Sequence, residues 1–129
     1  MKKNPFHKYL KQEDHLQIQL AQWLSHQYPN LLWIHVPNEG RRSPFEQYLF
    51  SLLGTAKGAS DMIFFEPRGK YHGLMIELKV IYANGKKNYP SEAQKQFIKN
   101  CQLRGYYATV VWTFDQAVDI IVEYISQGK

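Results

Sequence analysis

The sequence contains a single cysteine, Cys101, among its 129 residues. One thiol cannot form an internal disulfide, and it rules out every zinc site that requires several cysteines. The chain also has no apolar run of membrane-spanning length, and its first twelve residues lack the apolar core of a signal peptide. These absences argue against membrane proteins and disulfide-stabilised secreted proteins, so we expect a protein of the cytoplasm.

The composition is that of a folded, basic domain. Hydrophobic residues make up 44% of the chain and aromatic residues 15%, which excludes an intrinsically disordered protein. A chain of this length builds one domain around a single core. The net charge of +5 favours an anionic partner, nucleic acid first, although many basic proteins bind no nucleic acid.

The hydrophobic spacing predicts an alternation of helices and strands. Residues 1–12 are basic, and we expect them to form a flexible arm that is ordered only on contact. Apolar residues at three- and four-residue spacing indicate helices, and short apolar runs between turn residues indicate strands. We predict helices over 13–28, 45–54, 91–105 and 115–126, and strands over 31–36, 61–66, 71–80 and 106–114. This α-β-α-β-β-α-β-α order predicts an α/β fold over residues 13–129, with a mixed β-sheet flanked by helices.

Asp61, Glu77 and Lys79 form the most reactive combination in this arrangement. Strand alternation places Glu77 and Lys79 on one face, and the predicted hairpin brings Asp61 opposite or diagonal to Glu77. Two carboxylates suit a hard cation such as Mg²⁺, and a lysine beside them can position water or stabilise charge on a phosphate. The alternatives are a solvated sheet face or a cross-strand ion pair, with Asp61 as an ordinary turn residue.

Three polar residues on the predicted helices are further candidates for this site. Glu13 and Gln17 align with the inward-facing leucines of the first helix, where a buried carboxylate needs a partner such as a metal. Alternatively, Glu13 lies in the fraying first turn of the helix, where an acidic side chain interacts favourably with the helix dipole. Gln94 lies on the apolar face of its helix and could reach the sheet, but it also completes a capping box that begins at Ser91.

Basic residues occur in the loops that flank the proposed site. They suit contacts to phosphate, which give salt-sensitive, sequence-independent binding, although each one alone could equally be solubilising charge. The candidates for DNA binding are Arg41, Arg42, Lys57, Lys86 and Lys87.

Other residues have structural explanations. We expect His35 to be a core or edge residue of its strand. Trp23, Trp33 and Trp112 fit core packing better than base stacking, and we expect Cys101 to be a buried, unreactive thiol.

Together, these segments resemble the VRR-NUC domain, a branch of the PD-(D/E)xK nuclease superfamily. The matching segments are EDHLQ, VPNEGRRS, KGASD, ELK, SEAQ and GYYATVVW, which follow in this order between Glu13 and Trp112. The proline-aspartate pair of the superfamily is replaced here by Ser60-Asp61, which keeps the acidic position. The short chain is similar to stand-alone phage and bacterial members of this branch.

The resemblance implies a metal-dependent nuclease and assigns the metal ligands. Asp61 and Glu77 would bind Mg²⁺ or Mn²⁺, with the Leu78 backbone carbonyl as a third ligand. Glu13 would complete the acidic cluster, and Lys79 would be the catalytic lysine.

The resemblance also implies supporting residues and partners. Gln17 and Gln94 would be polar residues of the pocket. Stand-alone members resemble Holliday junction resolvases, which are homodimers that cut symmetric strands of branched DNA. Ile18 and the aromatic segment 45–50 are candidates for such a dimer interface.

The sequence therefore predicts a divalent-metal-dependent DNA endonuclease that acts on branched DNA as a homodimer. One alternative is a nuclease-like fold that binds DNA without cutting it, although the intact acidic and lysine positions argue against this. A second alternative is a structural protein in which the charged residues form an ion-pair network.

Overall fold

The computed structural model describes residues 4–37, 43–54 and 57–129. The elements in these residues are η1 (Pro5–Tyr9), α1 (Gln12–Gln27), β1 (Trp33–His35), α2 (Pro44–Leu53), β2 (Met62–Phe64), β3 (Leu74–Leu78), α3 (Glu92–Leu103), β4 (Tyr107–Val111) and α4 (Phe114–Ser126). After the short 3-10 helix η1, which the sequence analysis did not predict, the elements follow as α-β-α-β-β-α-β-α. The strands are shorter than predicted, because the outer residues of each apolar run lie in the connections.

The four strands form one mixed sheet in the order β1-β2-β3-β4. β1 pairs antiparallel with β2, and β2 pairs antiparallel with β3, with Met62 opposite Ile76. β3 and β4 are parallel and are connected through α3, as a parallel pair requires. The predicted hairpin is therefore confirmed, and β3 lies inside the sheet with a partner on each side.

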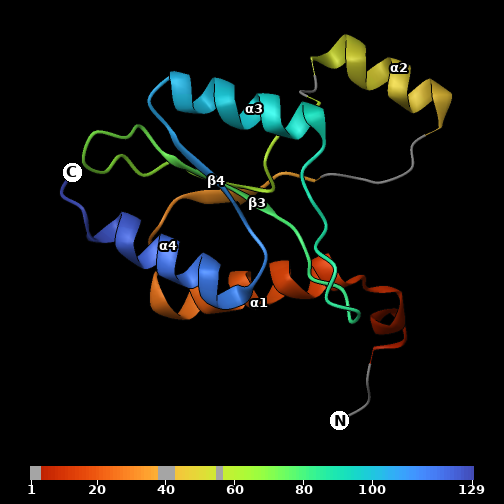
Figure 1. Cartoon of the computed structure of the whole chain (residues 1–129), viewed down its shortest axis with the longest axis horizontal. Helices are drawn as coiled ribbons and strands as arrows, with labels where there is room; N and C mark the ends of the chain where they lie inside the picture. The colour runs from red at the N-terminus through yellow and green to blue at the C-terminus, as the bar shows by residue number, and fades with distance from the viewer. Residues whose placement is uncertain (1–3, 38–42, 55–56) are drawn as a thin grey trace.

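Helices cover both faces of the sheet. Figure 1 shows α1 and α4 side by side on one face and α3 on the other. Leu74, Ile76 and Leu78 of β3 pack into the larger core beneath α1 and α4, whereas Met75 packs with Cys101 beneath α3. This alternation confirms the predicted mixed α/β fold, and it directs Glu77, which lies between Ile76 and Leu78, to the face that α3 covers.

The predicted helix ends have their expected backbone partners. The Ser91 hydroxyl accepts a hydrogen bond from the Gln94 N–H (3.2 Å), while the Gln94 side chain accepts one from the Ser91 N–H (2.8 Å). This is the capping box predicted from SEAQ. Gly54 closes α2 in the left-handed conformation, with a φ of 84°, as its position after the helix predicted.

The amino-terminal residues and α2 lie at the periphery. The first helix begins at Gln12, one residue earlier than predicted, and η1 occupies part of the predicted arm. Whether the arm is ordered only on contact stays a prediction. The helix α2 buries no residue, and Figure 1 shows it beyond the end of α3.

Several single-residue predictions can be compared with the structure. Cys101 is buried, and Trp23 and Trp33 pack against the larger core, as predicted. Trp112 is only half-buried, and it contacts the loop 81–90 instead of that core. In the described part of the chain, no helix combines the length and apolar character needed to cross a membrane.

Candidate active site

Asp61 and Glu77 meet where β2 begins and β3 ends. The antiparallel register that places Met62 opposite Ile76 places Asp61 opposite Glu77 when it is continued by one residue. The Asp61 Oδ2 atom accepts a hydrogen bond of 2.7 Å from the Leu78 backbone N–H. In an extended strand the N–H and C=O of one residue point to the same side, so the Leu78 carbonyl is directed toward the Asp61 side. The predicted convergence of these residues is therefore present.

Glu77 is buried beneath α3, with only 1% of its surface exposed. Its Oε1 atom accepts a hydrogen bond of 2.8 Å from the Gln94 side-chain amide and lies 3.8 Å from the Lys79 ammonium nitrogen. Its Oε2 atom is also buried and has no hydrogen-bond partner among the described residues. One oxygen of this carboxyl group thus accepts a hydrogen bond from Gln94 and lies near the Lys79 ammonium group, while the other has no N–H or O–H donor among the described residues.

The burial of Lys79 decides between the explanations of the Glu77–Lys79 pair. Lys79 is 8% exposed, so these residues do not form a solvated sheet face. The contact between them joins two positions of one strand and is not a cross-strand pair. Burying an ion pair costs several kcal/mol per ion, of which attraction recovers only part. Keeping two ionisable side chains at this depth is therefore costly for stability, and such sites are candidates for function.

The three carboxyl groups of the site all have a raised pKa. Burial, followed by the nearby Asp61 charge, raises the pKa of Glu77 from 4.5 to about 8, against the lowering effect of Lys79. Burial also raises the pKa of Asp61, although the hydrogen bond from the Leu78 N–H opposes this. Partial burial raises the pKa of Glu13, with the Lys79 charge acting in the opposite direction. A cation held between these groups would offset the cost of keeping their carboxylates ionised at a buried position.

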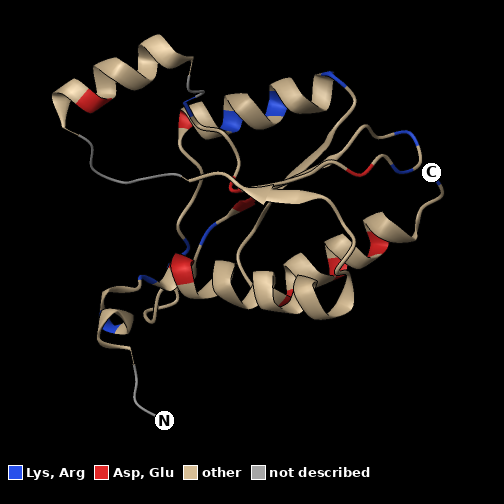
Figure 2. Ribbon diagram, turned by 180° about the vertical axis from the view of Figure 1, so that it is seen from behind, with Lys and Arg blue, Asp and Glu red and all other residues tan. Residues whose placement is uncertain are grey.

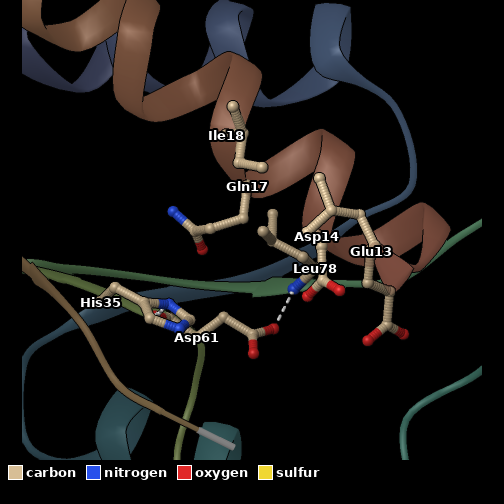
Figure 3. A pocket seen from close by; sticks show the side chains of 8 residues that line it. Glu13, Asp14, Gln17, Ile18, His35, Asp61 and Leu78 are labelled. Carbon is tan, nitrogen blue, oxygen red and sulfur yellow. Dashed lines mark hydrogen bonds between the residues drawn. The ribbon is translucent and has the colours of Figure 1, made fainter. Parts of the chain in front are cut away.

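A pocket of about 350 Å³ opens beside Asp61. Figure 3 shows α1 on one side of it, with His35 and Asp61 on the other. Its lining residues are Leu10, Glu13, Asp14, Gln17, Ile18, His35, Asp61 and Leu78. Both polar atoms of the Gln17 amide are buried and have no hydrogen-bond partner among the described residues. An amide in this state is ready to bind a group that enters the pocket.

Glu13 lies at the rim of the pocket and is exposed. It is close enough for its pKa to respond to the charges of Lys79 and Asp61, so α1 does turn it toward the site. Nevertheless, within residues 4–37, 43–54 and 57–129, no group of three or more His, Cys, Asp or Glu side chains could hold a metal ion. The predicted acidic cluster is thus an inner pair, Asp61 and Glu77, with Glu13 standing apart.

Gln94 fulfils both of the roles that the sequence left open. Its side-chain oxygen caps α3 at Ser91, and its side-chain nitrogen donates to Glu77. Because an amide has a donor and an acceptor at opposite ends, one side chain can serve both partners. The capping box therefore fixes the first turn of α3 and, through it, the position of Glu77.

Gly58 brings the KGAS loop against the start of α3. Its φ is +83°, and a Cβ atom at this position would lie 2.5 Å from the backbone carbon and oxygen of Ala93 and 2.7 Å from the Gln94 nitrogen. Only glycine fits such a close approach. The contact ties the loop that leads into Asp61 to the helix that carries Gln94, which gives the KGASD motif a structural explanation.

The predicted DNA-binding residues are placed only in part. Lys57, Lys86 and Lys87 are exposed in loops, and Lys87 lies over the Trp112 ring with its nitrogen 5.0 Å from the ring centroid. Arg41 and Arg42 lie outside the described residues. Figure 2 shows lysine and arginine on several sides of the described chain, so charge alone does not define one binding face.

His35 is a residue of the site that the sequence did not predict. His35 is exposed on the edge strand β1, with its Nδ1 atom 3.1 Å from the Asp61 backbone oxygen, and its ring faces the pocket. The edge position was predicted, but only the register of β1 against β2 reveals that His35 is a neighbour of Asp61. Asp14 was also missed; it accepts a hydrogen bond of 2.8 Å from the Lys11 N–H and lines the same pocket.

The inner residues fit a hard divalent cation. Asp61, Glu77 and the Leu78 carbonyl are all oxygen donors, the type that Mg²⁺ and Mn²⁺ prefer. The strongest indication is that the buried Glu77 Oε2 atom has no N–H or O–H donor among the described residues, while the Asp61 carboxyl lies close enough to raise the pKa of Glu77. Few protein ligands are expected for Mg²⁺, because it keeps several of its waters.

Comparison with known proteins supports the family resemblance. A solved structure described as a "VRR_NUC domain protein" matches with a TM-score of 0.76 and 28% sequence identity, and the match covers 93% of each chain. No protein-family model matches the sequence, and no curated protein matches it significantly. The similarity to the solved structure confirms the predicted resemblance to stand-alone VRR-NUC proteins and the nuclease-like fold.

Proposed function

We propose that this chain, whose fold is that of a VRR-NUC nuclease domain, is a divalent-metal-dependent endonuclease that hydrolyses phosphodiester bonds in DNA. The observation that supports this most strongly is the buried Glu77, with one oxygen hydrogen-bonded to Gln94 and near Lys79, and the other without an N–H or O–H donor in the described parts of the chain. No structural role needs a carboxylate of this kind next to a second one, Asp61. Asp61 also lines the pocket beneath α1, which gives a phosphate a route to this member of the pair.

Each residue of the site has a proposed task. Asp61, Glu77 and the Leu78 carbonyl hold Mg²⁺ or Mn²⁺, and when bound the cation supplies Lewis-acid polarisation of the phosphate and a lowered pKa for water. Lys79 orients the attacking water and stabilises the negative charge that develops on the phosphate. The water oxygen bonds to phosphorus and loses a proton to solvent, the bond from phosphorus to the leaving oxygen breaks, and that oxygen takes up a proton from solvent.

The outer residues position the inner ones. Gln94 holds the Glu77 carboxylate in place through its 2.8 Å hydrogen bond. The unpartnered Gln17 amide binds a phosphate oxygen or a water in the pocket, and Glu13 adds negative charge at the rim for the hydrated cation. Lys57, Lys86 and Lys87 bind backbone phosphates, and we propose the same for Arg41 and Arg42.

We further propose that the protein cuts branched DNA as a homodimer. Support comes from α2, where exposed apolar residues recur at positions i, i+3, i+4, i+7 and i+8. These are Phe45, Tyr48, Leu49, Leu52 and Leu53, each at least 36% exposed. A stripe at this spacing normally faces a core, and on α2 it faces solvent. A second copy of the chain would cover it, with Ile18, which is 37% exposed, as a further candidate contact. The cytoplasmic location and the bacterial or phage origin stay predictions.

Cleavage of a labelled four-way junction, beside a linear duplex of matched sequence, tests the proposal. Both substrates are incubated with Mg²⁺, with Mn²⁺ and with a chelator. We expect paired cuts in the junction only when a cation is present. Cuts in both substrates would leave a nuclease but remove the preference for branched DNA. Binding without cutting under every condition would establish the alternative, a DNA-binding module with a nuclease-like fold.

Matched variants separate the site from general charge. Glu77→Ala and Lys79→Ala remove the inner pair, and we expect each to reduce the cleavage rate by at least about 100-fold, which is typical for a group acting on transition-state charge. Glu92→Ala and Lys95→Ala remove an exposed ion pair of 3.3 Å on α3, and they should cut like the wild type. Wild-type cleavage by either inner variant would contradict the proposed mechanism.

A further inference from the structure

The loop that follows β3 folds back on the strand as a short hairpin. Ile81 pairs with Lys87 in an antiparallel bridge. The Tyr82 N–H donates to the Lys86 carbonyl (2.8 Å), and the Asn88 N–H donates to the Val80 carbonyl (2.9 Å). The Gln12 side chain of α1 also donates to the Ile81 carbonyl (2.7 Å), so the hairpin is held from two sides.

The register of this hairpin, continued beyond its bridge, directs Tyr89 toward the side of Lys79. Continuing the Ile81–Lys87 pairing by two residues places Tyr89 opposite Lys79. Residues two apart in a strand share a face, so Lys79, Lys87 and Tyr89 project to the same side. Tyr82 lies on the opposite side of the hairpin by the same alternation. This register thus directs an exposed aromatic ring to the same side of the chain as the proposed catalytic lysine.

Trp112 supports Tyr89 from the neighbouring strand. It follows Val111, whose side chain packs into the α1–α4 core, so Trp112 points to the face of Lys79. The Tyr89 and Trp112 rings are edge-to-face, 5.9 Å apart at 68°. The Trp112 indole N–H donates to the Asn88 carbonyl (2.6 Å), and the Lys87 nitrogen lies 5.0 Å above the Trp112 ring. Tyr89 is therefore held in place while 63% of it stays exposed.

An exposed ring fixed beside lysines has the chemistry of a site for an unpaired base. Aromatic side chains stack on bases of any sequence, and nearby lysines bind the backbone phosphates. Bases inside a duplex are already stacked on both faces, so only an unpaired or displaced base has a face to offer. An ordinary surface tyrosine needs neither an orienting tryptophan nor a place on the side of a buried lysine.

We propose that Tyr89 stacks on an unpaired base adjacent to the phosphate that Lys79 contacts. The preferred substrate is accordingly DNA whose base at the cleavage position is unpaired, as at a flap or gap, or is displaced from its stack at a branch point. This inference rests on the proposed function, because it uses the site of Lys79 as the place of cleavage. It adds a base-binding residue to a site whose other contacts are to phosphate.

Binding of an oligonucleotide that carries 2-aminopurine, measured in chelator so that no cutting occurs, tests this inference. The oligonucleotide is used single-stranded and in a fully paired duplex. Stacking on Tyr89 should change the fluorescence of the single strand, and Tyr89→Ala should weaken its binding roughly tenfold. Tyr89→Phe keeps the ring and should bind like the wild type. Tyr82→Ala removes a tyrosine that is 46% exposed on the other side of the same hairpin, and it should change nothing.

The outcomes separate this inference from the nuclease proposal. If the wild type binds and cuts DNA but Tyr89→Ala binds the single strand equally well, the stacking site is refuted and the nuclease stands. Equal losses in Tyr82→Ala and Tyr89→Ala would also refute it. If the wild type neither binds nor cuts either substrate, the proposed function fails and this inference fails with it. Selective loss in Tyr89→Ala, with rescue by Tyr89→Phe, establishes the site.

Discussion

Replacing Glu77 by glutamine should make the metal-free protein more stable at high pH. The carboxyl of Glu77 is buried next to Asp61, which raises its pKa from 4.5 to about 8. Between these two values the folded protein keeps a proton that the unfolded chain has released. The favourable contribution is therefore complete below pH 4.5 and is lost as the pH rises through about 8.

The expected size of the effect follows from this shift. One pKa unit corresponds to about 1.4 kcal/mol, so the wild type loses on the order of 5 kcal/mol from this group across the window. Glutamine has the shape of a protonated glutamate and does not titrate. Its side-chain oxygen can still accept from Gln94, and its N–H can donate to the Asp61 carboxylate. The free energy of unfolding of the variant therefore does not decrease through residue 77 as the pH rises. The pKa of Asp61 is also raised, and its effect on the stability has the same sign in the wild type and the variant.

Denaturant unfolding of both proteins in chelator, at pH 5 and at pH 8, measures the difference. The free energy of unfolding of Glu77→Gln, relative to the wild type, should be several kcal/mol more favourable at pH 8 than at pH 5. In thermal unfolding this corresponds to a relative gain of roughly 10 °C or more. Glu92→Gln, at a glutamate with a 93% exposed side chain, is the control and should show little change at either pH.

A divalent cation should reverse the order of stability. At pH 8 Mn²⁺ should stabilise the wild type by binding only the folded state, and it should leave Glu77→Gln nearly unaffected. If the relative stability of Glu77→Gln were the same at both pH values, the carboxyl would not be protonated in the folded protein. In that case our account of the electrostatics of this site would be wrong.

Two other substitutions test the architecture. Gly58→Ala should destabilise the protein by about 2 kcal/mol or more and slow cleavage, because the added Cβ would lie 2.5 Å from the Ala93 backbone and the residue has a left-handed conformation. Chemical unfolding and a cleavage assay measure the two effects. Wild-type values in both would show that the loop can move away from α3. Leu49→Lys combined with Leu52→Lys should yield a folded monomer in light scattering, because both residues belong to the exposed stripe of α2. Ser51→Lys, at an exposed serine outside that stripe, should leave the dimer intact, and a wild-type protein that is already monomeric would refute the proposed interface.

Local patterns predicted most of the elements of this fold. The leucine spacing in 13–28 predicted α1, and the short turn after β2 predicted the hairpin with β3. SEAQ predicted the capping box of α3, and Gly54 predicted the end of α2. These features depend on residues within about four positions of one another, so the sequence carries the information directly. The strand ends were less accurate, because pairing and not composition decides where a strand stops.

The pairing of Asp61 with Glu77 could also be anticipated, because a hairpin brings nearby positions together. The burial of the two side chains could not be anticipated from the sequence. The hydrogen bonds from Leu78 to Asp61 and from Gln94 to Glu77 each join residues 17 positions apart. Whether such groups are solvated or buried depends on the helix that packs over them. For this reason the sequence left a solvated face open for Glu77, and α3 decided against it.

The order of the elements, the family resemblance and the acidic and lysine positions of the proposed site could all be inferred from local sequence patterns. Only the folded chain shows that one Glu77 oxygen is buried without a hydrogen-bond donor among the described residues, that His35 borders Asp61 and that Tyr89 packs against Trp112. It also shows that the apolar stripe of α2 faces solvent. Periodicity identifies which side of an element is apolar, but only the packing of the whole chain determines what that side meets.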